Sequence, residues 1–309
     1  MFGSLSGLLK PCYLFAPGTL LRRIYLHFSW PESATAEVEL PWGMQIEVSL
    51  NDSIGREIFK QRIFDLAVSE CAWRLLSPGD QVIDAGANIG YMTMLFAARI
   101  GKTGFVNSFE PHPQVRATLQ RNVDHINNSG SAGRVVVHEC ALGDSRGNAD
   151  LIETDYFAIN QGTAKIASPE TTQSPNVRTH LVPIETLDSL FPRESFALLK
   201  IDVEEFETKV LKGAERLLSS QRVRHIIYED HTLGRSGLAE LLSGFGYSVY
   251  SIGHGPFGPL LQQSYSGTVA IDASWESASF VATLDPDRVM ALMNRKGWSV
   301  LKGARPQSR

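Results

Sequence analysis

Asp84, Gly86, Asn88 and Gly90 have the types and the spacing of a cofactor-binding turn. They follow a short β-forming stretch and precede an apolar segment at 91–100, which indicates a buried strand, a glycine turn and a helix. Glycines let the backbone approach a ligand, and the free N–H groups of a new helix favour a carboxylate or phosphate. The pattern therefore predicts a site for a nucleotide-like cofactor.

The spacing also indicates which cofactor binds there. A dinucleotide fingerprint G-x-G-x-x-G starting at Gly86 would need glycine where Asn88 and Tyr91 stand, so two of its three positions fail. The form D-x-G-x-N-x-G matches instead the first motif of methyltransferases that use S-adenosylmethionine. Roughly 20 residues further on, a second strand ends in Glu110, where an acidic residue binds the ribose diol in such folds.

Seven segments of the chain follow, in order and at the expected separations, the pattern of one family: VIDAGANIGYMT, GFVNSFEPHP, NVDHIN, HECALGD, ETLDSL, LLKIDVEEFETKVLKGAERLL and IIYEDH. The sequence thus resembles the FkbM family of S-adenosylmethionine-dependent methyltransferases, over about residues 54–250. The resemblance implies O-methylation of a hydroxyl on a sugar, a glycolipid, or a polyketide or peptide natural product. The alternatives are N- or carboxyl-methylation on the same fold, or a non-catalytic cofactor-binding partner subunit.

Alternating β and α patterns predict an α/β fold with a mostly parallel sheet and helices on both faces. The resemblance adds a Rossmann-like class I methyltransferase fold of seven strands, in the order 3-2-1-4-5-7-6 with the last strand antiparallel. We expect the strands at 81–85, 104–109, 134–140, 196–201, 223–229, 247–252 and 279–284, and the helices at 90–100, 112–127, 205–219, 236–245 and 285–295. Residues 1–76 form an N-terminal extension, with a hairpin from 36–40 and 45–50 and a helix at 58–76, and residues 77–309 form the catalytic domain.

The carboxyl ends of the strands gather polar residues at one edge of the sheet, where open α/β sheets bind their ligands. Contacts to S-adenosylmethionine are expected from ten residues at this edge: Asp84, Gly86, Ala87, Asn88, Gly90, Glu110, Pro111, Cys140, Ala141 and Asp202. The plainer alternatives are that the acids cap helices, that Asn88 only stabilises its own turn, and that Cys140 is a packing residue.

Methylation of an alcohol needs removal of its proton, and His, Asp or Glu can serve as the base. The candidates are Asp202, Glu229 and His231, which follow the fourth and fifth strands. Each has a structural alternative, an N-cap for Asp202 and a hydrogen-bonded surface group for His231.

Four other charged residues have two interpretations each. Lys200 either orients Asp202 or only extends from a strand end, and Glu204 either reaches the site or belongs to an acidic first helical turn. Glu70 faces the site if its helix is oriented suitably, but a solvated glutamate is the simpler interpretation. Glu205 stands where the family usually has glycine, which weakens inference about the acceptor but leaves the cofactor inference untouched.

A metal site is not expected. Asp202 with Glu229 or Asp230 would offer oxygen ligands to Mg²⁺, but no His/Cys pair has zinc spacing.

The segment 147–192 is a long insertion between the third and fourth strands. We expect a hairpin from 148–152 and 179–182, whose middle is either a lid over the acceptor or a mobile surface loop. A second glycine-rich stretch, 254–259, is also expected to border the site.

Charge and composition restrict the partners. A net charge of −4 without Lys/Arg clusters argues against nucleic acid, and three widely spaced cysteines suit a reducing cytoplasm. Lys10, Pro11 and Pro17 interrupt the apolar N-terminus well short of the ~20 residues of a membrane span. Residues 20–26 favour a short amphipathic helix, for which peripheral membrane contact is one interpretation and packing on the domain is the commoner one. The family resemblance implies a small-molecule or carbohydrate-like hydroxylated acceptor as the partner.

Overall fold

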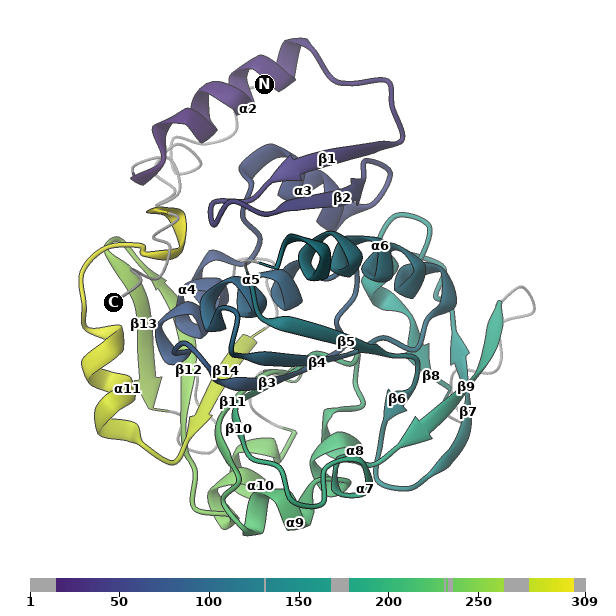
Figure 1. Cartoon of the computed structure of the whole chain (residues 1–309), viewed down its shortest axis with the longest axis vertical. Helices are drawn as coiled ribbons and strands as arrows, with labels where there is room; N and C mark the ends of the chain where they lie inside the picture. The colour runs from purple at the N-terminus through teal and green to yellow at the C-terminus, as the bar shows by residue number, and fades with distance from the viewer. Residues whose placement is uncertain are drawn as a thin grey trace.

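The protein is described by a computed structural model, which covers residues 15–130, 132–167, 178–230, 232, 236–263 and 278–302. An eight-stranded sheet crosses its centre, with helices on both faces (Figure 1). The strands lie side by side in the order β13 (Gly258–Gln263), β12 (Ser248–Gly255), β14 (Ala278–Thr283), β11 (Val223–Asp230), β10 (Phe196–Ile201), β3 (Gln81–Ala85), β4 (Phe105–Phe109) and β5 (Arg134–His138).

The sheet confirms the predicted class of fold but not the predicted number of strands. Pairing is parallel from β5 to β11, and β14 enters antiparallel between β11 and β12. The expected count of seven is wrong, because β13 pairs with β12 and adds an eighth strand at the edge, so the complete order differs there. The glycine-rich stretch 254–259 forms the turn of this extra hairpin.

Two hydrophobic cores cover the two faces of the sheet, because the central strands carry buried apolar side chains on both faces. All six residues of β10 are buried. On one face lie α4 (Leu66–Leu75), α5 (Tyr91–Ile100), α6 (Pro113–Ser129) and α11 (Pro286–Met293). On the other lie α7 (Leu187–Leu190), α8 (Glu207–Lys212), α9 (Glu215–Ser219) and α10 (Leu238–Gly244).

The N-terminal region contains α2 (Pro17–Phe28) and the predicted hairpin, formed by β1 (Thr35–Glu39) and β2 (Gln45–Ser49). The helix expected at 58–76 is wrong as one element, since the chain forms α3 (Ser53–Gln61) and then α4. Arg62 ends α3 in the left-handed region at φ 61°, and Asp65 caps α4 by accepting the N–H of Val68.

The helix expected at 205–219 is likewise divided into α8 and α9. The break is at Gly213, where a Cβ atom would lie 1.9 Å from the carbonyl oxygen of Gly143. Close backbone approach, which the helical pattern does not reveal, therefore separates the two helices.

The insertion after β5 forms a second sheet, of four strands in the order β6 (Ala141–Leu142), β9 (Thr179–Glu185), β7 (Gly147–Ile152) and β8 (Lys165–Ile166). The predicted hairpin is confirmed, since Ile152 pairs with Thr179 and Asn148 with Pro183. A 3₁₀ turn (η2, Gln161–Thr163) connects β7 to β8. The middle of the insertion, 168–177, lies outside the described residues.

The predicted boundary at residue 76 does not coincide with a break in the packing. Residues of β1, β2, α3 and α4 join the same hydrophobic cluster as α5 and α6. Asn122 of α6 adds a polar contact, accepting the N–H of Glu47 and donating to the carbonyl of Ile89. The division into two regions stays a prediction.

The predicted amphipathic helix exists as α2, and its apolar stripe faces outward. The exposed fractions are 70% for Leu21, 50% for Ile24, 65% for Tyr25 and 82% for Phe28. Contact of this stripe with a membrane surface stays a prediction. Among the helices of the described residues, none combines the length and the apolarity that a bilayer crossing requires.

Candidate active site

The glycine turn connects β3 to α5 and brings the backbone against the segment after β10. Gly86 has φ 75°, and a Cβ atom there would lie 1.7 Å from the carbonyl oxygen of Asp202. At Gly90, φ is 95° and a Cβ atom would lie 2.7 Å from Leu119. The two glycines are therefore required by the packing of the turn itself.

Asn88 and Glu110 connect the turn to the end of β4. The side-chain oxygen of Asn88 accepts the N–H of Ile89 at 2.7 Å, so it does stabilise its own turn. The Glu110 carboxylate accepts the N–H groups of Asn88 and His112 at 3.0 and 2.8 Å. Burial raises the pKa of Glu110 to about 7, against the lowering effect of these two hydrogen bonds.

Lys200 lies under the turn and joins three groups. Its ammonium group donates to the carbonyl of Gly86 at 3.0 Å, and lies 3.1 Å from the Asp202 carboxylate and 3.8 Å from that of Asp84. Burial acts to lower the pKa of Lys200, but the two carboxylates outweigh it and the pKa is raised. Lys200 is therefore a buried cation that fixes the turn relative to Asp202.

Three carboxyl groups gather beyond Lys200, at the ends of β10 and β11. They belong to Asp202, Glu204 and Glu229. Burial, followed by the Asp202 charge and a hydrogen bond to Asp202, raises the pKa of Glu229 well above its ordinary range. Burial and the charges of Asp202, Glu207 and Glu205 raise the pKa of Glu204 to about 7.

A single cavity of about 820 Å³ runs along this edge of the sheet. Its wall includes most of the predicted site residues: Gly86, Ala87, Asn88, Glu110, Pro111, Cys140, Ala141, Asp202 and Glu229, together with Lys200 and Glu204. Residues far apart in the sequence thus meet at one surface, as the parallel topology predicted.

Asp84 does not line the cavity, although we expected a cofactor contact there. Its carboxyl group is fully buried beneath the turn, where it accepts a hydrogen bond from Thr93 at 2.5 Å. Burial raises its pKa, and the nearby Lys200 opposes that shift. Gly90 is also absent from the wall, because it begins α5 against Leu119.

Three acidic residues named above lie outside the cavity wall. Glu70 neither faces the site nor is solvated: it is fully buried and binds Arg74 and the N–H groups of Ser299 and Val300. Asp230 is turned away from Asp202 and accepts hydrogen bonds from Thr232 and Ser236. Glu205 is exposed and pairs with Lys165 at 2.9 Å.

His231 lies outside the described residues, so its predicted role as a base stays a prediction. The glycine-rich stretch 254–259 does not contribute to the cavity wall, because it packs near Arg74 and the C-terminal segment.

Sequence reasoning missed a second part of the cavity wall. That part is formed by α3, the start of α4 and the connection from η2 to β8, with the polar residues Ser53, Glu57, Asp65, Asn160, Gln161, Thr163 and Lys165 beside the apolar Ile54, Phe64 and Val68. The only signal in the sequence was the length of the insertion, since functional loops are often long.

Comparison with known proteins gives consistent matches over this region. The family model described as "Methyltransferase FkbM domain" matches residues 84–249. The 31-O-demethyl-FK506 methyltransferase FkbM of Streptomyces tacrolimicus is 33% identical over 224 residues, covering 63% of this chain and 80% of that protein. Methyltransferase 1 of Beauveria bassiana (strain ARSEF 2860) is 31% identical over 180 residues, covering 52% of this chain and 66% of that protein.

Among solved structures, the methyltransferase FkbM from Methylobacillus flagellatus KT matches with a TM-score of 0.44 and 18% identity. The match covers 67% of this chain and 44% of that one, so this chain spans less than half of that structure.

Proposed function

This chain belongs to the FkbM methyltransferase family, and we propose that it methylates a hydroxyl oxygen of a sugar, glycolipid or natural-product acceptor. Its cofactor is S-adenosylmethionine. The acceptor class is supported by the Streptomyces tacrolimicus relative, which is named as a methyltransferase of 31-O-demethyl-FK506. It is also supported by the polar side chains that α3, the start of α4 and the segment around η2 contribute to the cavity wall, which offer hydrogen bonds to hydroxyl groups.

The residues of the turn fit this cofactor. Glu110 lines the cavity and uses its two oxygens to accept one backbone N–H each, and a carboxylate has about four acceptor positions in all. Two positions therefore remain for the ribose diol. We propose that Cys140, Ala141 and Pro111 border the base, and that Asp84 acts indirectly by holding Lys200 and the turn.

When bound, S-adenosylmethionine supplies an electrophilic methyl group on a sulfonium centre. The protein must then align the acceptor oxygen and take its proton, and positioning supplies much of the acceleration in such displacements. We propose Glu204 as the base, because a base is most effective when its pKa lies near the working pH. A hydrogen bond joins Asp202 to Glu229, whose pKa is raised, so we propose that this pair and Lys200 fix the charge around the reacting centre.

The main observation behind the proposal is that one cavity is lined by the glycine turn, by a group of carboxyls and by further polar side chains from α3 and the segment around η2. Calorimetric titration with S-adenosylhomocysteine, run beside NAD, tests the cofactor half. We expect binding of the homocysteine compound, weakened in Glu110→Ala, and no binding of NAD. A folded protein that binds neither compound would contradict the proposal.

Methylation of a panel of hydroxylated acceptors tests the other half. Removing a positioned base typically costs about 10²–10⁴-fold in rate, so Glu204→Gln should lose turnover by about that factor while S-adenosylhomocysteine affinity is kept. The matched control is Glu205→Gln, an exposed neighbour outside the cavity wall, which should stay active. Equal turnover in both variants would exclude Glu204 as the base, and a wild-type protein that methylates only amines or carboxylates would support the alternative acceptor classes.

A further inference from the structure

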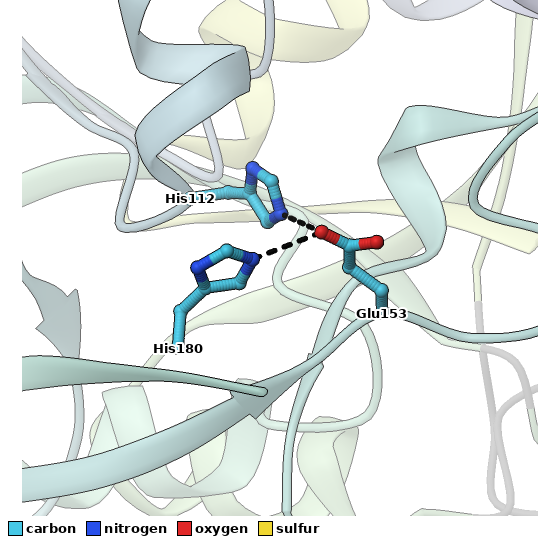
Figure 2. Close-up of side chains that lie close together, drawn as sticks. All are labelled: His112, Glu153 and His180. Atoms are coloured by element: carbon cyan, nitrogen blue, oxygen red, sulfur yellow. Dashed lines mark hydrogen bonds and ion pairs between the residues drawn. The ribbon is translucent and has the colours of Figure 1, made fainter. Parts of the chain in front are cut away.

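His112, Glu153 and His180 converge outside the cavity wall, although they are 27 or more residues apart in the chain (Figure 2). His112 precedes α6, Glu153 follows β7, and His180 lies in β9. Figure 2 shows both imidazole rings directed at one oxygen of the Glu153 carboxylate. The potential ligand atoms all lie within 4.8 Å of one another.

One of the two distances to Glu153, that of His112, suits a shared cation better than a direct hydrogen bond. Nε2 of His112 lies 3.4 Å from Oε1 of Glu153, and Nε2 of His180 lies 2.9 Å from the same oxygen. A tetrahedral ion with bonds of about 2.0–2.1 Å holds its ligands about 3.4 Å apart, whereas N–H···O hydrogen bonds cluster near about 2.9–3.0 Å. The His112 separation therefore equals a tetrahedral edge and exceeds an ordinary hydrogen bond.

Burial makes the His112 ring costly to leave unsatisfied. Its side chain is 1% exposed, and its Nε2 has no hydrogen-bond partner of good geometry among the described residues. Phe157 packs at 4.5 Å from the ring, which keeps Nε2 directed at Glu153. The Glu153 and His180 side chains are 13% and 31% exposed, so a water molecule has access to complete a coordination shell.

We propose that His112, Glu153 and His180 form a binding site for a divalent transition metal ion of the zinc class. Two imidazole nitrogens and one carboxylate oxygen are a donor set that Zn²⁺ accepts, with water as the fourth ligand. The ion would replace the proton that each imidazole now directs at Glu153. At His112 it would also place a proton on Nδ1 and remove that atom's contact with the N–H of Val115, which at 3.5 Å is weak.

The position of the site gives the ion a structural role. Glu153 and His180 are at the base of the insertion, whose later residues line the cavity, and the backbone N–H of His112 donates to Glu110. A bound ion would fasten the insertion to the start of α6, two residues from the proposed ribose ligand. It would act by holding the second sheet in place, without touching the reacting groups.

Metal analysis of the tag-free, full-length protein tests the proposal independently of methyl transfer. After equilibration with ZnCl₂ and dialysis, we expect one Zn²⁺ per chain and an increase in Tm with added zinc. Substitution with Co²⁺ should give the visible absorption of a tetrahedral site. His180→Ala and Glu153→Gln should weaken zinc binding at least about tenfold and abolish the change in Tm. Both side chains are partly exposed, so we expect these variants to fold, and His125→Ala, which alters an exposed histidine of α6, is the matched control.

Zinc binding that is equal in the wild type, His180→Ala and Glu153→Gln would overturn the proposal. So would the absence of stoichiometric zinc in a folded wild-type protein, which would identify the three side chains as a hydrogen-bonded group only.

Discussion

Glu205 occupies a backbone position that suits glycine. Its φ is 70°, in the left-handed region that costs an ordinary side chain roughly 1 kcal/mol or more. This conformation is a physical reason for the glycine usual in the family at this position. The ion pair of Glu205 with Lys165 is partly exposed and contributes at most about 1 kcal/mol to the free energy of unfolding.

We expect Glu205→Gly to be more stable than Glu205→Ala by about 1 kcal/mol. Both variants lose the ion pair with Lys165, and only alanine keeps the unfavourable φ, so their difference isolates the backbone effect. Urea unfolding of the two variants measures this difference. Equal stabilities, or a more stable alanine variant, would show that the segment relaxes out of the left-handed region.

Glu110 should make cofactor affinity depend on pH. Its pKa of about 7 in the free protein lies well above the ordinary value for glutamate, and ribose hydroxyls donate to the ionised form. As pH falls below about 7, a proton must be removed before binding, so affinity should fall by up to about tenfold per pH unit. Titrations with S-adenosylhomocysteine from pH 6 to 8 test this in wild type and Glu110→Gln. The variant should bind more weakly and show no such slope, and a flat wild-type profile would contradict the role of Glu110.

At the scale of elements, α4 is fastened to the C-terminal segment by one buried ion pair. Arg74 donates to Glu70 and to the carbonyls of Leu292, Met293 and Arg295 and is 7% exposed. Glu70 in turn accepts the N–H groups of Ser299 and Val300. The two side chains thereby satisfy backbone groups that would otherwise be buried without partners.

Arg74→Met should destabilise the protein by about 3–5 kcal/mol, because it leaves Glu70 charged, buried and without its cation. Denaturant unfolding gives the value. Arg121→Met is the control, since Arg121 forms an exposed pair with Glu47 and should cost less than about 1 kcal/mol. A small effect of Arg74→Met would mean that water reaches Glu70 or that Glu70 takes up a proton.

The sequence predicted elements whose signals are local. The alternation of residues 36–40 and 45–50 indicated β1 and β2, and the glycine turn indicated the junction of β3 and α5. The division of the helix at 58–76 was missed, because left-handed residues other than glycine, such as Arg62, have no sequence signature. Similarly, Glu70 was misplaced because two of its partners, Ser299 and Val300, lie more than 200 residues away.

The same reasoning applies to the site. Strand ends placed Glu110, Asp202 and Glu229 at the cavity, since parallel strands direct their carboxyl ends to one edge. Position at a strand end does not show whether a side chain faces the cavity or lies beneath the turn. The predicted cofactor contact of Asp84 was therefore wrong, since its side chain is buried beneath the turn. The polar residues that the insertion adds to the cavity wall have no fixed spacing from the motifs. The length of the insertion was the only sequence signal for them.

At the scale of the whole molecule, the cavity concentrates acidic groups whose pKa values lie above the ordinary range. Besides Glu110 and Glu204, burial raises the pKa of Glu229 in the cavity wall and of Asp84 beneath the glycine turn. Raised values mean that the folded protein binds more protons than the unfolded chain. At neutral pH the site therefore lowers the free energy of unfolding. Such shifts are common where carboxyls are held close together for function.

The sign of the resulting pH dependence follows from linkage. Glu110 and Glu204 have folded pKa values of about 7, and unfolded glutamate titrates near pH 4.5. Between these values the folded state keeps protons that the unfolded chain has lost, so the contribution of both residues to the free energy of unfolding falls as pH rises. Above about pH 7 the contribution is constant.

Glutamine does not titrate, so the Glu110→Gln/Glu204→Gln double variant should gain stability relative to the wild type as pH rises from 4.5 to about 7. The difference should then level off. Urea unfolding of both proteins at pH 4.5, 5.5, 6.5 and 7.5 measures it. A double variant whose difference from wild type is independent of pH would show that the two carboxyls titrate normally in the folded protein. The pH-dependent affinity expected from Glu110, and the assignment of Glu204 as a base near neutrality, would then both lose their physical basis.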